Sequence, residues 1–289
     1  AALNSITAED YYLIQGPPGT GKSFVLSIII MIELAILNNK VIIIGPNHMA
    51  INNTLIQVVK NFPYLYPIVH KVGQSYNAPN YKVNTDNLTQ EIKDFLKNYG
   101  EELYLKNITH LNTSYVNQFE GPIAIGLTSH SLYTKRARGL ECDTLIVDEA
   151  GQMTIPLALM GMIKAKKIIF AGDYKQLPPI VSSDEVCEEM KKSVFQALIS
   201  EANCTMLDVS FRMCEPICNF VSELFYDGEL KPMKPGCGDT IINTNPLYSF
   251  DTPIVIQHID DCGEQTSDME AEFIAEIIKN YLNQGLPAS

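Results

Sequence analysis

The segment from residue 16 to residue 23 combines glycines with a lysine and a serine at a spacing that binds phosphate. It matches the pattern G-x-x-x-x-G-K-[ST], follows an apolar run at residues 11–15 and precedes a helix-length apolar segment, which is the context this pattern requires. In such a loop backbone N–H groups close around the phosphates, the lysine reaches the β and γ phosphates, and the hydroxyl ligates Mg²⁺. The predicted phosphate loop consists of Gly16, Pro17, Pro18, Gly19, Thr20, Gly21, Lys22 and Ser23.

Two adjacent carboxylates, Asp148 and Glu149, stand at the end of another apolar run. A carboxylate at this point holds Mg²⁺ through its water shell, so we expect Asp148 and Ser23 to form the metal site. Glu149 is placed to orient and deprotonate the attacking water, which is the role of a general base. An apolar strand ending in Asp-Glu is weak evidence alone, but together with Lys22 the pair predicts hydrolysis of a nucleoside triphosphate.

A third segment, Gly-Asp-Tyr-Lys-Gln-Leu-Pro-Pro at residues 172–179, also follows an apolar run. In this order the phosphate loop, the Asp-Glu-Ala-Gly-Gln segment at residues 148–152 and this third segment resemble motifs I, II and III of superfamily 1 helicases. More narrowly, the chain is similar to the branch of the RNA-surveillance helicase of nonsense-mediated decay and the helicase-nuclease of Okazaki-fragment processing. The resemblance implies that Gln176 contacts the γ-phosphate of ATP and communicates the loss of this phosphate to the nucleic-acid groove.

A short element at residues 210–213, Ser-Phe-Arg-Met, resembles the aromatic-Arg-Met element of the same family. The resemblance implies that Phe211 stacks on adenine and that Arg212 contacts the γ-phosphate. Ser210 stands where glutamine is common, and Phe211 lacks the hydroxyl of the more usual tyrosine. The alternative interpretation is a core phenylalanine followed by a surface arginine.

Two further segments resemble family motifs that touch the nucleic-acid backbone. The first follows the apolar run at residues 41–45, and the second follows the run at residues 123–127, where hydroxyls can bind phosphates without net charge. Simple helix capping by Asn47 or Asn52 is the alternative for the first segment. A basic cluster at residues 135–138 either borders the phosphate track or forms a solvated turn. The residues implied to contact nucleic acid are Pro46, Asn47, His48, Asn52, Thr128 and Ser129.

These residues depend on short β-branched runs that alternate with helix-length segments, a pattern typical of repeated βαβ units around a parallel sheet. We predict strands at residues 11–15, 41–45, 68–72, 123–127, 144–148, 167–171 and 205–208. The predicted fold class is α/β, a P-loop NTPase with a RecA-like parallel sheet sandwiched by helices.

The organisation of the chain follows from changes in composition. Residues 1–235 are predicted to form the first RecA-like ATPase domain, with a polar insertion at about 73–121 that contains an amphipathic helix at 89–105. Residues 236–253 have the composition of a linker. Residues 254–289, with a strand at 254–258 and a helix at 269–283, are predicted to begin a second, truncated RecA-like domain.

Composition excludes several other classes of protein. The 289 residues carry a formal charge of −12, which argues against coating nucleic acid through a broad positive face. The seven cysteines are odd in number and scattered, which disfavours a disulfide framework or a zinc site and favours the cytoplasm. The apolar stretch at residues 24–37 is too short and interrupted to span a membrane, so we predict a buried helix and no membrane partner.

We therefore predict an ATP-dependent, Mg²⁺-dependent helicase domain whose parent chain moves on single-stranded DNA or RNA; the branch implies a 5′ to 3′ direction. Motifs V and VI have no counterpart here, so the rest of the parent chain is expected to supply the remainder of the second RecA-like domain and its catalytic arginine. An ATP-binding switch or scaffold without unwinding is the alternative. A small-molecule kinase would leave Gln176 and the adjacent carboxylates unexplained.

Overall fold

The core of the molecule is a parallel β-sheet. The computed structural model describes residues 1–72, 106–107, 121–134, 137, 139–181, 187–233, 258–259 and 266–283. Within these residues the main sheet has eight strands in the order β4-β3-β5-β2-β6-β7-β1-β8, and all pairings are parallel. The strands are β1 (Tyr11–Gln15), β2 (Lys40–Ile44), β3 (Val69–Lys71), β4 (Lys106–Asn107), β5 (Ile123–Gly126), β6 (Cys142–Val147), β7 (Ala165–Gly172) and β8 (Cys204–Met206).

The seven predicted strands are all present, with ends that differ from the prediction by one or two residues in most cases. Strands β2 and β5 are buried along almost their whole length, because helices cover both faces of the sheet. Strand β4 was not predicted. It has two residues and lies within the segment that we interpreted as an insertion.

Helices α1 (Ala2–Thr7), α2 (Lys22–Ala35) and α3 (His48–Asn61) cover one face of the sheet. In α3 the buried residues Ile51, Leu55 and Val58 recur at helical spacing, and they pack with apolar residues of α2 and of the strands. The opposite face is covered by η3 (Ser129–Tyr133), η4 (Ala150–Gln152), α6 (Ile155–Met162) and α8 (Val194–Leu198). Two further short elements are η1 (Pro63–Ile68) and α7 (Glu188–Lys191).

The buried helix predicted at residues 24–37 is α2, although it ends at Ala35. Its interior glutamate, Glu33, is fully buried and lies 2.6 Å from Lys167 Nζ. The same carboxylate accepts hydrogen bonds from Thr144 Oγ1 at 2.9 Å and Asn39 Nδ2 at 2.6 Å. The acidic residue that interrupts this apolar helix is therefore paired inside the core, as a buried charge must be. No described helix is long and apolar enough to cross a membrane.

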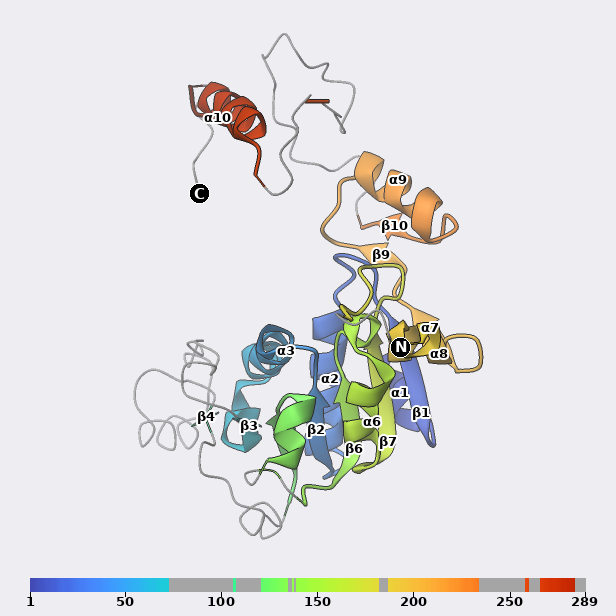
Figure 1. Ribbon diagram of the computed structural model, residues 1–289. Coiled ribbons are helices and arrows are strands. Elements are labelled where there is room, and N and C mark those ends of the chain that lie inside the picture. The colour runs from blue at the N-terminus through green and yellow to red at the C-terminus, as the bar shows by residue number, and fades with distance from the viewer. Residues whose placement is uncertain are drawn as a thin grey trace.

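A small unit at residues 209–233 lies beyond one end of the sheet (Figure 1). Its strands β9 (Val209–Ser210) and β10 (Lys231–Pro232) are paired in parallel and joined through helix α9 (Glu215–Phe225). Cys218, Tyr226 and Leu230 form its buried core. We refer to these residues as the 209–233 unit.

Parts of the predicted organisation lie outside the described residues. These parts are nearly all of the insertion at 73–121 with its helix at 89–105, the linker at 236–253, and the strand at 254–258 except His258. The helix predicted at 269–283 is confirmed as α10 (Asp268–Asn283). The division into two RecA-like domains stays a prediction.

Candidate nucleotide site

The phosphate loop connects β1 to α2 and takes its shape from two glycines. Gly19 and Gly21 have φ values of +75° and +81°, a backbone region that other residues rarely adopt, and Gly21 caps the N-terminus of α2. A Cβ on Gly19 would lie 2.3 Å from Arg212 Cβ. Gly19 is thus required both for the turn and for the close approach of the 209–233 unit.

The topology brings the three predicted motifs together. Strands β6, β7 and β1 are neighbours in the sheet, and Asp148, Asp173 and Gly16 each follow the carboxyl end of one of them. Ligands of open α/β sheets bind at this edge. Residues separated by more than 120 positions in the sequence therefore form one site.

Lys22 is held by both predicted catalytic carboxylates. Its Nζ lies 2.6 Å from Glu149 Oε1 and 3.3 Å from Asp148 Oδ1. Asp148 is buried, and its other oxygen, Oδ2, accepts a hydrogen bond from Thr54 Oγ1 at 2.5 Å. Burial alone would lower the pKa of Lys22, but the charges of Asp148 and Glu149 outweigh it and raise that pKa above its ordinary value. Lys22 is therefore a fixed ammonium at the point where phosphates are expected.

Glu149 has an unusual backbone conformation for a residue other than glycine, with φ +53°. Its N–H donates to Asp148 Oδ1 at 2.8 Å, and the chain then enters η4. A Cβ on Gly151 would lie 2.4 Å from the backbone oxygen of Asp173. This close packing fixes the Asp-Glu segment against the start of the third motif.

Asp173 organises the third motif. Its Oδ1 accepts hydrogen bonds from Gln15 Nε2 at 3.3 Å and from the Lys175 N–H at 3.2 Å. Its Oδ2 accepts from Gln176 Nε2 at 2.8 Å and from Tyr226 Oη at 2.5 Å. Gln176 is exposed, so its carbonyl oxygen and second N–H remain available to a nucleotide.

The aromatic-Arg-Met element lies directly on the phosphate loop. The Phe211 N–H donates to Gly19 O at 2.8 Å, and Ser210 Oγ donates to Pro18 O at 3.0 Å. The Phe211 ring is exposed, with 63% of the residue accessible, so the alternative of a core phenylalanine is wrong. Arg212 is also exposed beside the loop. Both side chains are free to meet a nucleotide.

The residues predicted to contact nucleic acid lie at the same edge, after β2 and β5. Asn47 is the N-cap of α3, with its side chain accepting from the Ala50 N–H at 2.9 Å, so the capping interpretation is confirmed for Asn47. Thr128 Oγ1 lies 2.9 Å from Ser131 Oγ, and Ser129 is buried. Pro46, His48 and Asn52 are half-buried. Lys135, Arg136 and Arg138 lie outside the described residues.

Sequence reasoning missed Thr54, Gln15 and Tyr226. Thr54 gave one faint signal, as a polar residue between the buried Ile51 and Leu55 of an apolar helix face. Tyr226 gave none, because its partner is 53 residues away in the sequence.

The donor set at this edge suits Mg²⁺. Ser23 supplies a hydroxyl and Asp148 a carboxylate, which are the hard oxygen donors that Mg²⁺ prefers. Within the described residues Lys22 is the ion-pair partner of both Asp148 and Glu149, so a divalent cation has negative charge to neutralise once Lys22 turns to phosphate. The described residues contain no group of three or more His, Cys, Asp or Glu that could hold another metal.

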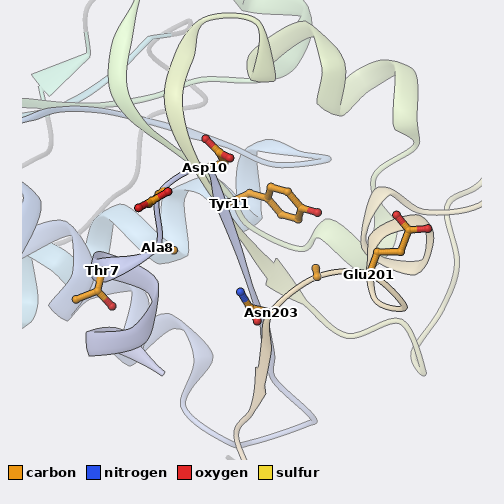
Figure 2. A pocket seen from close by; sticks show the side chains of 8 residues that line it. Thr7, Ala8, Asp10, Tyr11, Glu201 and Asn203 are labelled. Carbon is orange, nitrogen blue, oxygen red and sulfur yellow. The ribbon is translucent and has the colours of Figure 1, made fainter.

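A separate pocket of about 410 Å³ lies at the amino end of β1, away from the phosphate loop (Figure 2). The residues that line it include Thr7, Asp10, Tyr11, Glu201 and Asn203. Its carboxylates disfavour phosphate binding. The nucleotide site is therefore assigned to the opposite edge.

Fold and site together define a P-loop nucleoside triphosphatase. Two family models, each described as an AAA domain, match residues 124–184 and 190–288. An ATP-dependent helicase of Methanocaldococcus jannaschii is 24% identical over all of this chain and 55% of its own length. The DNA polymerase alpha-associated DNA helicase A of Schizosaccharomyces pombe is 24% identical over 98% of this chain and 49% of its own length.

The DNA replication ATP-dependent helicase/nuclease DNA2 of Saccharomyces cerevisiae is 31% identical over 83% of this chain and 14% of its own length. Among solved structures, the helicase nonstructural protein 10 of an arterivirus, in complex with DNA, aligns with a TM-score of 0.45 and 17% identity over 86% of this chain and 47% of that one. That similarity carries no functional argument. The family models and relatives support the superfamily 1 helicase assignment that the motif order predicts, and two of these relatives are named ATP-dependent helicases. The chain spans about half the length of the first two relatives.

Proposed function

We propose that this chain is the Mg²⁺-dependent ATPase domain of a helicase that moves on single-stranded nucleic acid. The observation that carries the proposal is the ammonium of Lys22, held within 3.3 Å of both Asp148 and Glu149 at the end of a phosphate loop. The names of the relatives support ATP as the nucleotide.

In the proposed mechanism, Lys22 moves from the carboxylates to the β and γ phosphates as the nucleotide enters. Ser23 and Asp148 would hold Mg²⁺, which supplies positive charge to the phosphate oxygens. Glu149, released from Lys22, accepts the proton of the attacking water, and Gln176 orients that water and the γ-phosphate. Arg212 contacts the γ-phosphate, while Phe211 stacks on adenine.

The proposed nucleic-acid path runs over the carboxyl edge of β2 and β5. Two of the relatives are named DNA helicases or DNA helicase/nucleases, which supports DNA, and the family branch supports movement from 5′ to 3′. Residues 1–235, 236–253 and 254–289 are proposed as the first RecA-like domain, a linker and the beginning of the second. A longer parent chain would complete the groove between the two domains.

The test is ATP turnover by the full-length protein with and without single-stranded DNA or RNA, followed by displacement of a strand from a duplex with a 5′ overhang. Stimulated turnover with strand displacement supports the proposal. Binding of ATP without stimulation or displacement would favour the alternative, a nucleotide-dependent switch or scaffold.

A further inference from the structure

Tyr226 is a buried tyrosine that none of the family motifs includes. It caps the C-terminus of α9, and 5% of it is accessible. Its hydroxyl donates to Asp173 Oδ2 at 2.5 Å, and burial together with the Asp173 carboxylate raises the pKa of the phenol. The phenol therefore stays protonated and remains a donor at any working pH.

The same carboxylate oxygen also holds Gln176. Asp173 Oδ2 accepts from both Tyr226 Oη and Gln176 Nε2, while Oδ1 accepts from Gln15 and the Lys175 N–H. Four donors thus fix the carboxylate in one orientation. Gln176 is exposed, and the hydrogen bond to Asp173 holds its side chain among the described residues. Loss of a donor from Oδ2 leaves the carboxylate, and with it Gln176, less well fixed.

The 209–233 unit reaches the site at two places. At one end, Ser210 and Phe211 bond to the phosphate loop. At the other end, Tyr226 bonds to Asp173. The pairing of β9 with β10 and the bond from the Leu230 N–H to Ser222 Oγ hold these two ends in one body. A shift of this unit over the phosphate loop would therefore also move Tyr226, which holds the Asp173 carboxylate that bonds to Gln176.

We propose that Tyr226 is a positioning residue for γ-phosphate recognition, which acts by holding Asp173 so that Asp173 orients Gln176. The inference rests on the proposed function, in which Gln176 contacts the γ-phosphate. It predicts that the Tyr226 hydroxyl contributes to the preference for nucleoside triphosphate over diphosphate, because ADP has no γ-phosphate for Gln176 to contact.

The experiment measures affinities of the full-length protein for Mg²⁺ with a non-hydrolysable ATP analogue and for Mg²⁺ with ADP. Tyr226→Phe removes only the hydroxyl. The matched control is Tyr12→Phe, since Tyr12 is equally buried and its hydroxyl lies 2.6 Å from Thr205 Oγ1 in β8. Gln176→Ala and the double variant complete a cycle that measures coupling between the two residues.

We expect Tyr226→Phe to weaken binding of the ATP analogue by about threefold to tenfold, the net contribution of one ordinary hydrogen bond, and to change ADP affinity less than about twofold. Tyr12→Phe should leave the ratio of the two affinities unchanged. In the Gln176→Ala background, Tyr226→Phe should cause no further loss of preference.

An unchanged ratio in folded Tyr226→Phe, an equal loss for both nucleotides, or additive effects in the double variant would overturn the inference. Thermal unfolding checks the fold. If Tyr226→Phe does not fold, Asp173→Asn gives the second measurement: a selective loss of analogue affinity supports the inference, and an unchanged ratio overturns it. Failure of the unmodified protein to bind either nucleotide would instead overturn the proposed function.

Discussion

At the scale of single residues, the site is arranged around competition for the ammonium of Lys22. Without nucleotide, Asp148 and Glu149 neutralise it, and they outweigh the burial that would otherwise lower its pKa. Triphosphate brings stronger negative charge to the same ammonium. In the proposed mechanism, nucleotide binding exchanges one set of ionic partners of Lys22 for another and frees Glu149 for the attacking water.

This exchange predicts different effects for two substitutions. Lys22→Ala should weaken nucleotide binding, because it removes the charge that meets the phosphates. Glu149→Gln should preserve binding, because it removes only the base and one competitor for Lys22, and it should block hydrolysis. Nucleotide titration and turnover by the full-length variants check both expectations; normal turnover in Glu149→Gln would refute the role of Glu149.

The exposed ring of Phe211 gives a second prediction. Phe211→Ala should weaken ATP binding by about 1 to 3 kcal/mol, the usual contribution of an aromatic ring that stacks on a base. Phe211→Tyr should bind as the unmodified protein does. The measurement is the ATP affinity of each variant, with thermal unfolding as the control for the fold. Normal ATP affinity in folded Phe211→Ala would mean that adenine does not stack on Phe211.

Sequence analysis identified the site residues that belong to short motifs with a characteristic spacing. Lys22 and Asp148 each lie in a short motif at a strand end, where residue types alone indicate the chemistry. Thr54 bonds to Asp148 across 94 residues, and Tyr226 to Asp173 across 53. Such contacts depend on how α3 and α9 pack, which the motif patterns do not specify.

At the scale of elements, the main strands were predictable because helices cover both faces of the sheet. The sequences of strands such as β2 and β5 consequently consist almost entirely of apolar residues. Strands β9 and β10 were not predictable, because each has two residues and their pairing depends on the return of the chain through α9. The strand ends were less well predicted than the strands, since hydrogen bonding to neighbours decides them.

Strand β3 contains a buried lysine, Lys71, whose destabilising effect on the fold should be measurable. Lys71 is fully buried, and its Nζ has no hydrogen-bond partner within the described residues. Burial lowers its pKa from 10.5 to about 8. Between these values the unfolded chain binds a proton that the folded chain does not, so this group makes stability rise with pH across that window.

We expect Lys71→Met to raise the free energy of unfolding by about 1 to 3 kcal/mol at pH 7, where the folded protein carries the buried charge. The gain should shrink at pH 9.5, because the folded protein then holds Lys71 neutral. Urea unfolding of both proteins at the two pH values provides the measurement. A gain that is absent at pH 7, or that does not change with pH, would contradict this account of Lys71.

At the scale of the whole molecule, arginine is scarce. The 289 residues contain three arginines, at positions 136, 138 and 212, and Arg212 lies beside the phosphate loop. Phosphoryl transfer builds charge on the γ-phosphate, and an arginine supplied across a cleft accelerates related reactions by about 10³ to 10⁵. In the superfamily to which the motifs belong, the resemblance implies that the second RecA-like domain supplies that arginine, and this chain covers about half of its first two relatives.

The isolated 289-residue chain should therefore bind Mg²⁺ and nucleotide, hydrolyse ATP very slowly and separate no strands. Nucleic acid should stimulate it little, because in the proposed two-domain mechanism the second domain supplies the other half of the groove that closes on a strand. The test compares steady-state ATP turnover by this chain and by the full-length protein. Each is measured with and without single-stranded DNA or RNA. Robust strand-stimulated turnover by the isolated chain would contradict the two-domain mechanism. It would place the arginine expected from the second domain at Arg136 or Arg138, and Arg136→Ala and Arg138→Ala would then identify it.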